Sequence, residues 1–184
     1  MDLPDKKYKV IYSDPPWRLQ NASTIMYKCD KPIENKYKTM SKEEIESLPV
    51  GDIADENCSL FLWTTHTFLE DALAVMQKWG FKYHCCITWD KKSGFSMWGF
   101  HRRTELCLYG YKGKININQK GSFIPTIITE KKRKHSQKPD LMRKLIEEHT
   151  PQPRIELFAR QKYDGWDSWG DELPETIQKH IVEG

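Results

Sequence analysis

The order of apolar and polar stretches constrains the fold of this chain more than any other feature of its sequence. Residues 8–13 and 59–65 are predominantly apolar, as expected for strands that are buried on both faces. After the second run, apolar residues recur at helical spacing until Gly80, a typical residue just past the end of a helix. Strands that alternate with helices indicate a parallel sheet covered by helices. We therefore predict an α/β fold with a mostly parallel sheet.

Further elements continue this alternation. Ser41 and Glu44 form a capping box, which predicts a short helix that ends before Pro49. Pro139 is expected at the first position of another helix, which ends at Thr150-Pro151. The positions of that helix predicted to face the core are Leu141, Leu145 and Ile146. Additional strands are predicted at residues 83–89, 105–111, 123–129 and 154–159.

Three long connections follow predicted strands, namely residues 18–38, 90–104 and 130–137. In open α/β sheets, ligands bind in the crevice outside the carboxyl ends of the strands. Long loops in a compact domain are usually functional, so these connections are expected to surround one pocket. The chain has no internal repeat and no linker, and we predict that residues 1–184 form a single domain.

The cysteine, histidine and apolar content argues against several classes of protein. The five cysteines include no Cys-x-x-Cys pair, and the six histidines lie at no ligand spacing with them, which disfavours a disulfide framework and a metal site. The N-terminus carries no apolar signal segment, and no stretch approaches the roughly 18 apolar residues of a membrane span. We therefore expect a protein of a reducing compartment, the cytoplasm, that binds neither a membrane nor a metal.

The tetrapeptide Asp14-Pro15-Pro16-Trp17 directly follows the first predicted strand. The lone pair of an exocyclic nucleobase amine is delocalised into the ring, so a carboxylate and a main-chain carbonyl must hold the amine protons to free that pair. Each proline fixes φ and supplies a carbonyl without a competing N–H, while the indole offers a stacking face for an extruded base. On these four residues alone, an Asp-Pro turn with the tryptophan in the core is the alternative.

Six blocks occur in a fixed order between about residue 8 and about residue 172. They are Asp14-Pro15-Pro16-Trp17, Tyr37-Lys38-Thr39-Met40-Ser41, Leu60-Phe61-Leu62-Trp63-Thr64, Ser136-Gln137-Lys138-Pro139-Asp140, Arg154-Ile155-Glu156-Leu157-Phe158-Ala159-Arg160 and Gly165-Trp166-Asp167-Ser168-Trp169-Gly170. In this order they resemble the adenine N(6)-methyltransferase family. That family includes the catalytic subunit of the eukaryotic messenger-RNA adenosine methyltransferase and many small bacterial and phage DNA methyltransferases.

The resemblance implies a single-domain, Rossmann-like methyltransferase fold in permuted order, with the catalytic block first and the strand of Glu156 last. It also implies methylation of the N(6) amine of adenine, with S-adenosylmethionine as the cofactor and the base flipped into a pocket at residues 14–17. The chain lacks a glycine-rich fingerprint, which agrees with a cofactor that carries no phosphate. We favour DNA as the substrate because the sequence holds no separate RNA-binding module. The same reaction on RNA and a catalytically inactive partner subunit are the alternatives.

The resemblance also assigns residues to the substrate base. It places Asp14 and the Pro15 carbonyl on the amine and Trp17 against the ring. It carries Tyr37 onto a base-contacting tyrosine and, more loosely, Glu105 onto an acid of the pocket. For the last two, a loop anchor and a surface strand residue are the alternative roles.

A second group of residues is assigned to the cofactor. A carboxylate at a strand end suits ribose hydroxyls or an amino group, and Glu156 has that position. A lysine at a helix N-terminus suits a carboxylate, and Lys138 precedes the helix that starts at Pro139. The resemblance adds cofactor contacts at Leu157, Phe158, Arg160, Asp171 and Glu172. For the first two, plain core packing is the alternative, and the last two stand where relatives often carry amides, which leaves that contact open.

Positive charge is concentrated in two of the predicted connections, although the net charge of the chain is only +3. Such a run is often merely solvated, but beside a base pocket it is suited to phosphates, with salt-sensitive affinity and little sequence content. The residues predicted to contact the nucleic-acid backbone are Arg102, Arg103, Lys131, Lys132, Arg133 and Lys134. We expect the protein to act on DNA as a monomer or homodimer.

Overall fold

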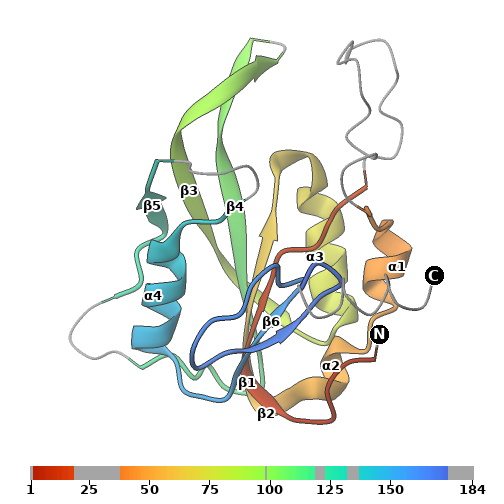
Figure 1. Cartoon of the computed structure of the whole chain (residues 1–184). Helices are drawn as coiled ribbons and strands as arrows, with labels where there is room; N and C mark the ends of the chain where they lie inside the picture. Colours follow the sequence, from red (N-terminus) through yellow and green to blue (C-terminus); the bar gives the residue numbers. More distant parts are fainter. Residues whose placement is uncertain (1, 19–37, 98, 119–122, 132–136, 174–184) are drawn as a thin grey trace.

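A seven-stranded sheet forms the centre of the computed structural model, which describes residues 2–18, 38–97, 99–118, 123–131 and 137–173 (Figure 1). The strands are arranged in the order β5-β3-β4-β2-β1-β6-β7. They comprise β1 (Tyr8–Ser13), β2 (Ala54–Thr64), β3 (Lys82–Met97), β4 (Phe100–Lys112), β5 (Ile127–Thr129), β6 (Arg154–Leu157) and β7 (Asp167–Trp169). The helices are α1 (Lys42–Glu46), α2 (Val50–Ile53), the short 3-10 helix η2 (His66–Phe68), α3 (Leu69–Lys78) and α4 (Asp140–His149).

Most neighbouring strands in this sheet are parallel. The central strand β1 pairs in parallel with β2 and β6, β6 pairs in parallel with β7, and β5 pairs in parallel with β3. Only β4 runs against its neighbours β2 and β3. The predicted α/β architecture with a mostly parallel sheet is therefore confirmed. The carboxyl ends of β1, β2, β3 and β6 consequently lie at the same edge of the sheet.

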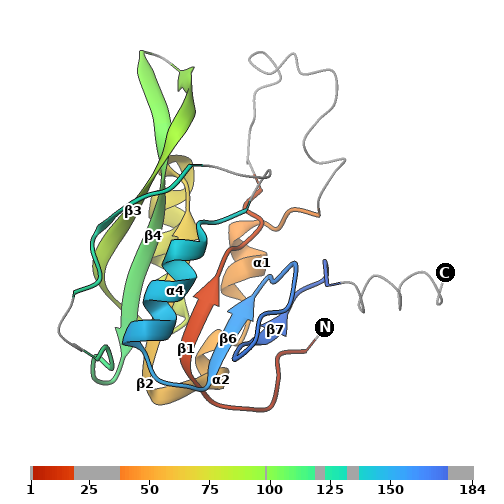
Figure 2. The same ribbon diagram turned by 60° about the vertical axis from the view of Figure 1, so that its left-hand side comes forward.

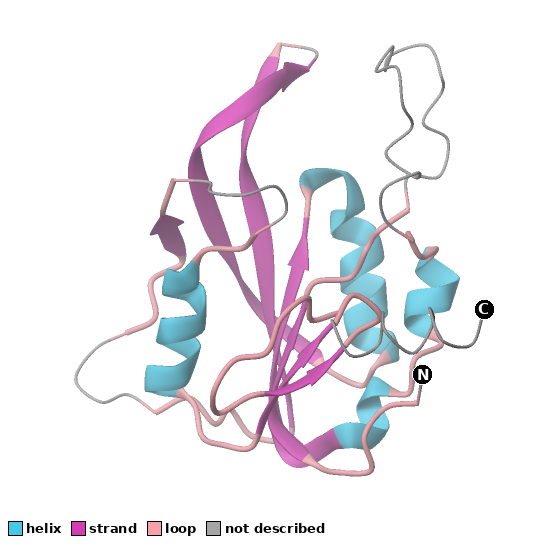
Figure 3. Ribbon diagram, viewed as in Figure 1, coloured by secondary structure: helices cyan, strands magenta, loops and turns pink. Residues whose placement is uncertain are grey.

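Helices cover both faces of the sheet (Figures 2 and 3). One face packs against α1, α2 and α3, through fully buried side chains such as Ile45, Val50 and Met76. The other face packs against α4, through Met142 and Ile146. The strands β1 and β2 contribute side chains to both cores, which explains why their sequences are apolar with little alternation.

The local signals for helix ends are confirmed. The Ser41 hydroxyl accepts a hydrogen bond from the Glu44 amide, and the Glu44 carboxylate accepts one from the Ser41 amide at 2.6 Å, so the capping box is complete. Gly80 follows α3 with φ +85°, a left-handed conformation that favours glycine. Thr150 ends α4.

The prediction of a loop at residues 90–104 is wrong. These residues continue β3 and β4 as an antiparallel hairpin, in which Phe95 pairs with Arg102 and Met97 pairs with Phe100. The prediction failed because the segment is polar, lacks strict alternation and has a register shift between Asp90 and Phe95. Figures 1 and 2 show the hairpin extending well beyond the body of the molecule.

Other boundaries differ from prediction as well. The predicted strand at 123–129 is reduced to Ile127–Thr129, and Pro139 caps α4 instead of starting it. Leu141 does not face the core, since Met142 takes that position on α4. The short elements α2 and β7 were not predicted. The connection 18–38, apart from its two end residues, and residues 132–136 of the connection 130–137 lie outside the described residues. Among the described residues, no helix is long and apolar enough to cross a membrane.

Candidate active site

The tetrapeptide at 14–17 lies at the carboxyl end of β1, between β2 and β6. A second segment of the chain holds it in place. The Met40 amide donates to the Pro16 carbonyl at 2.8 Å, and the Arg18 amide donates to the Met40 carbonyl at 2.9 Å. The Pro15 carbonyl already accepts the Trp17 amide at 2.9 Å, so it has one lone pair left for a ligand. The backbone of the motif is thus fixed before any substrate binds.

The ring of Trp17 is also held on one side. Its indole nitrogen donates to the Trp63 carbonyl at 3.1 Å. Its face stacks on Phe68, with ring centroids 5.8 Å apart and an interplanar angle of 17°. The side chain is only partly buried. A base that stacks on Trp17 therefore has only the face opposite Phe68 available.

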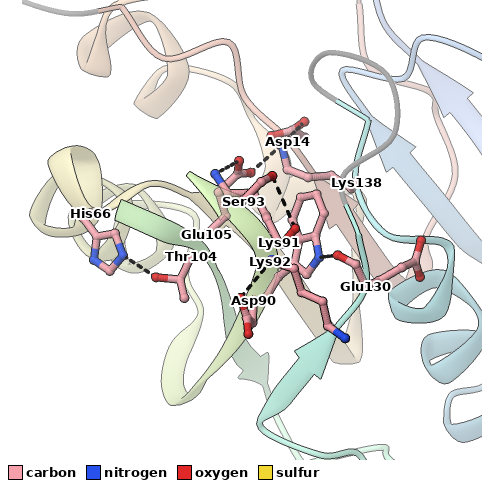
Figure 4. A network of polar contacts seen from close by, with 11 residues as sticks. Asp14, His66, Asp90, Lys91, Lys92, Ser93, Thr104, Glu105, Glu130 and Lys138 are labelled. Atoms are coloured by element: carbon pink, nitrogen blue, oxygen red, sulfur yellow. Dashed lines mark hydrogen bonds and ion pairs between the residues drawn. The ribbon is translucent and has the colours of Figure 1, made fainter. Parts of the chain in front are cut away.

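An alternating network of charges begins at Asp14 (Figure 4). Lys138 contacts the Asp14 carboxylate at 2.7 Å and the Glu105 carboxylate at 3.5 Å. Lys91 then contacts Glu105 at 3.0 Å. The four residues come from the end of β1, the segment before α4, β4 and β3, so the network joins elements that are distant in the sequence.

Burial and charge pairing act in opposite directions on this network. Burial lowers the pKa of the Lys138 ammonium, but Asp14 and Glu105 outweigh it and the pKa is raised. Burial raises the pKa of the Glu105 carboxyl, but Lys138 and Lys91 outweigh it and the pKa is lowered. Lys138 is therefore charged and Glu105 ionised at neutral pH.

Glu156 lies on β6 beside Tyr12 of β1, and its carboxylate contacts Arg143 of α4 at 2.6 Å. The Arg143 guanidinium is stacked 3.5 Å from the Tyr163 ring centroid and 4.9 Å from that of Trp166. Burial raises the pKa of the Glu156 carboxyl, Arg143 opposes this, and nearby Asp14 adds to the rise. Asp14 thus lies directly after β1 and Glu156 on the adjacent strand β6, and the charge of Asp14 contributes to the raised pKa of Glu156.

The N-terminus of α4 is occupied by a carboxylate of the chain itself. Glu130, which follows β5, accepts from the Asp140 amide at 3.4 Å and the Leu141 amide at 3.2 Å. Its carbonyl accepts from the Trp89 indole at 2.8 Å. The sequence predicted that this helix end would help to bind a ligand carboxylate. The Glu130 carboxylate already accepts from the amides there, so a ligand would have to compete with it. Lys138 reaches the site through its side chain, directed toward Asp14.

The base of the β3–β4 hairpin is fixed by side-chain contacts with η2. His66 and Thr104 are hydrogen-bonded at 2.7 Å, and Arg102 donates to the Thr67 hydroxyl at 3.2 Å. Arg103 is paired with Asp90 across the hairpin. The hairpin and the tryptophan platform are thereby attached to the same short helix.

The remaining predicted cofactor residues lie at the end of β6 and beyond it. Leu157 is fully buried in the core, so its side chain is unavailable to a ligand. Phe158 has φ +60° and packs edge-on against Trp169 with ring centroids 5.4 Å apart. Arg160 contacts Glu172 at 3.4 Å, and Asp171 is exposed. Lys131 is exposed, while Tyr37, Lys132, Arg133 and Lys134 lie outside the described residues.

Several residues of the site were not recognised from the sequence. Lys91 and Arg143 each hold a predicted carboxylate, Phe68 supports Trp17, and Glu130 caps α4. No short motif marks any of them, because each contact joins elements far apart in the chain. Among the described residues, no group of three or more histidine, cysteine, aspartate or glutamate side chains is arranged to hold a metal ion.

Comparison with known proteins places this site in a family. The MT-A70 family model matches residues 8–172. The type II methyltransferase M.MunI of a Mycoplasma species is 35% identical over 95% of this chain and 81% of its own length. An N(6)-adenosine-methyltransferase MT-A70-like protein of Arabidopsis thaliana is 29% identical over 90% of this chain and 24% of its own length.

A further relative shows how the domain is shared by larger proteins. The N(6)-adenine-specific methyltransferase METTL4 of Mus musculus is 25% identical over 91% of this chain, but over only 38% of its own length. This chain thus spans most of the bacterial relative and a minor part of the plant and mouse relatives. The chain therefore belongs to the MT-A70 family of adenine N(6)-methyltransferases.

Proposed function

We propose that this protein transfers a methyl group from S-adenosylmethionine to the exocyclic N(6) amine of adenine in DNA. The observation that carries the proposal is the meeting of Asp14, Lys138 and Glu105 at the carboxyl end of β1, beside the platform of Trp17. A carboxylate, a cation and a flat ring at one strand end are the groups needed to hold an aromatic amine. We further propose that residues 1–184 act as one methyltransferase domain.

The side chains present fit the proposed cofactor. S-adenosylmethionine supplies an activated methyl group on a sulfonium, together with a ribose diol and a charged amino acid. Glu156 is suited to the diol or the amino group, and Lys138 is suited to the carboxylate. Arg160, with Glu172, lies beyond the end of β6 and is proposed to complete the site.

Asp14 has three tasks in the proposed reaction. It would accept hydrogen bonds from the adenine amine, stabilise the positive charge that develops on the nitrogen during methyl transfer, and accept the proton that the nitrogen releases. The remaining lone pair of the Pro15 carbonyl is proposed to accept the second amine proton. Because the donor is already activated, most of the catalytic effect comes from alignment of the amine with the methyl group. Glu105, held ionised by two lysines, is proposed to contact the base edge.

DNA is favoured over RNA as the substrate. The relative named a type II methyltransferase is matched over 81% of its length, whereas the relative named an adenosine methyltransferase is matched over 24%. This chain thus corresponds to a nearly whole bacterial enzyme of that name and to one part of a longer plant protein. Methylation of adenosine in RNA is the second candidate, favoured by the name of the plant relative.

The test is transfer of a tritiated methyl group to defined polymers. Linear plasmid DNA free of adenine methylation and transcribed RNA of the same sequence are incubated with the protein and the labelled cofactor, then digested to nucleosides. The expected product is labelled N(6)-methyldeoxyadenosine from the DNA. Label on adenosine from the RNA alone would replace the DNA proposal by the second candidate. Cofactor binding without transfer to either polymer would indicate an inactive partner subunit.

A further inference from the structure

The arm formed by β3 and β4 extends beyond the rest of the sheet (Figures 1 and 2). Within the described residues, β2 pairs with β4 only as far as Leu106, and β5 pairs with β3 only between Thr88 and Asp90. Beyond these points the two strands pair only with each other. Between Asp90 and Thr104 the chain is therefore a two-stranded ribbon that is attached to η2 at its base. We call this segment the hairpin arm.

A large apolar side chain stands near the tip of the arm. Phe100 is 74% exposed and directly follows Gly99, which has φ +79°. An exposed phenylalanine here contributes nothing to either core of the molecule. Leaving its ring in water forgoes the stabilisation that burial would bring. The position suits a side chain that is buried only when a partner is bound.

The base of the arm is part of the candidate active site. Glu105, which contacts Lys138 and Lys91, lies only five residues after Phe100 on β4. At about 3.4 Å per residue, the tip stands roughly 17 Å from the pocket. The contacts of His66 and Arg102 fix the direction of the arm relative to the platform of Trp17. The tip is thus held at a defined distance from the proposed base site.

The charge of the arm identifies the kind of partner. Residues 90–104 contain four lysines and arginines and a single acidic residue, a net charge of +3, while the net charge of the whole chain is also +3. Lys91 is largely buried against Glu105, so the charge that the arm presents to a partner comes from Lys92, Arg102 and Arg103. A polyanion is the complementary partner. The major groove of B-DNA is about 12 Å wide and admits a two-stranded β-ribbon.

We propose that the hairpin arm enters a groove of duplex DNA and that Phe100 inserts into the base stack beside the target adenine. This inference rests on the proposed function, because it concerns how the enzyme extracts a paired base. Apolar side chains that enter a base step unstack it, and an extruded base leaves a gap that must be filled. Phe100 fills that gap, while Lys92, Arg102 and Arg103, the cations of the arm that are at least partly exposed, contact the phosphates on either side.

A defect confined to duplex substrates is expected when Phe100 is truncated, because a single strand has no stack from which the base must be removed. Linear plasmid DNA free of adenine methylation is used either as duplex or after heat denaturation and rapid cooling. Phe100→Ala is expected to lower methylation of the duplex at least about tenfold and to change methylation of the denatured strands by less than about twofold. Phe100→Leu, which keeps an apolar wedge, should retain most of the duplex activity.

Phe123 provides a matched control, since it is 77% exposed and lies outside the arm. Phe123→Ala should leave both activities unchanged. Equal losses on duplex and denatured DNA for Phe100→Ala, or no loss on either, would overturn the inference while the proposed function stands. A change from dimer to monomer on size-exclusion chromatography would also overturn it, since the tip would then be an interface between copies. Wild-type protein that methylates neither form would overturn the proposed function together with the inference.

Discussion

Lys138 joins the carboxylates of Asp14 and Glu105, so two further charged side chains of the candidate site depend on this one residue. A buried cation between two anions stabilises all three, and removal of one member leaves an uncompensated charge. The Lys138 ammonium has three N–H donors, so it can bind a cofactor carboxylate while it keeps its contacts with Asp14 and Glu105. Lys138 donates to Oδ2 of Asp14, which leaves Oδ1 as the acceptor for the amine. Cofactor binding and substrate binding are thus expected to be linked through this lysine.

Loss of the Lys138 ammonium should weaken cofactor binding. We expect Lys138→Ala to reduce the affinity for S-adenosylmethionine by about 1.5–3 kcal/mol, the range for hydrogen bonds to charged groups. Isothermal titration calorimetry measures this difference. Lys91→Ala serves as the control, since Lys91 contacts Glu105 but not Asp14 and should leave cofactor affinity unchanged. Unchanged affinity in Lys138→Ala would remove this residue from the cofactor site.

Asp14 should affect turnover more than binding. Asp14→Asn keeps the shape of the side chain but replaces one acceptor oxygen by a donor. The interaction that this change removes is stronger in the transition state than in the ground state. We expect turnover on adenine substrates to fall at least about a hundredfold, or about 2.7 kcal/mol, with little change in cofactor affinity. Single-turnover kinetics give the rate of the chemical step. Near-normal methyl transfer by this variant would contradict the active-site assignment.

Arg143 should control the pH dependence of cofactor binding through Glu156. Burial and Asp14 both raise the pKa of the Glu156 carboxyl, and Arg143 opposes them. In Arg143→Met the pKa should rise further, and an acceptor carboxylate binds the cofactor only above its pKa. Affinity should therefore fall by about tenfold per pH unit as the pH decreases below the new pKa. The wild type should show this loss only at lower pH.

A second arginine separates this effect from a loss of packing. The Arg154 guanidinium also lies over the Trp166 ring, at 5.9 Å, but it donates to backbone carbonyls at the end of α4. Arg154→Met should lower the melting temperature without moving the pH at which cofactor affinity falls. Calorimetric titrations from neutral to acidic pH, over the range in which each variant stays folded, compare the variants. Parallel pH profiles for Arg143→Met and the wild type would assign Arg143 a purely structural role.

At the scale of elements, α4 links the core to the site. Its buried face packs against the sheet, Lys138 directly precedes its N-cap residue Pro139, and Arg143 is its fourth residue. The position of both side chains depends on the cap that Glu130 places on the first amides of the helix. A carboxylate at this end also interacts favourably with the helix dipole.

The cap should contribute measurably to stability. We expect Glu130→Ala to lower the free energy of unfolding by about 1 kcal/mol, the usual effect of removing a side-chain cap. Thermal and urea denaturation both measure this change. Glu148→Ala is the matched control, because an acidic residue near the other end of the same helix is unfavourable to the dipole, and its removal should not destabilise the protein. If Glu130→Ala and Glu148→Ala were equally stable, Glu130 would not act as a stabilising cap.

Elements with local signals were predictable from the sequence, and those without were not. The capping box at Ser41 and the apolar strand before Asp14 depend on neighbouring residues, and both are present as expected. The hairpin arm was missed because its strands are polar and exposed. A strand with no buried face does not show the alternation of apolar and polar residues by which strands are recognised. Asp14 at the end of β1 and Lys138 just before α4 were both assigned to the site from the sequence, but their direct contact was not predicted. The roles of Lys91, Arg143 and Glu130 depend on tertiary contacts that no sequence pattern records.

At the scale of the whole molecule, positive charge governs the expected affinity for DNA. Besides the hairpin arm, the chain has the basic run Lys131-Lys132-Arg133-Lys134. Replacing these four residues by alanine should weaken duplex binding at low salt and flatten its salt dependence. The log–log slope should change by about 0.9 for each phosphate that the variant no longer neutralises. Fluorescence anisotropy over a salt series measures the slope, and an unchanged value would identify the run as a solvated cluster.

The central position of β1 has a consequence for the synthesis of the protein. Asp14 follows a strand made at the beginning of translation, whereas its neighbour Glu156 belongs to β6, which is made near the end. Lys138 and Arg143 are also made late. The tetrapeptide proposed to be catalytic is therefore synthesised long before the groups proposed to hold the methyl donor. Methylation must wait until the last strands have joined the first, so a prematurely terminated chain is expected to be inert.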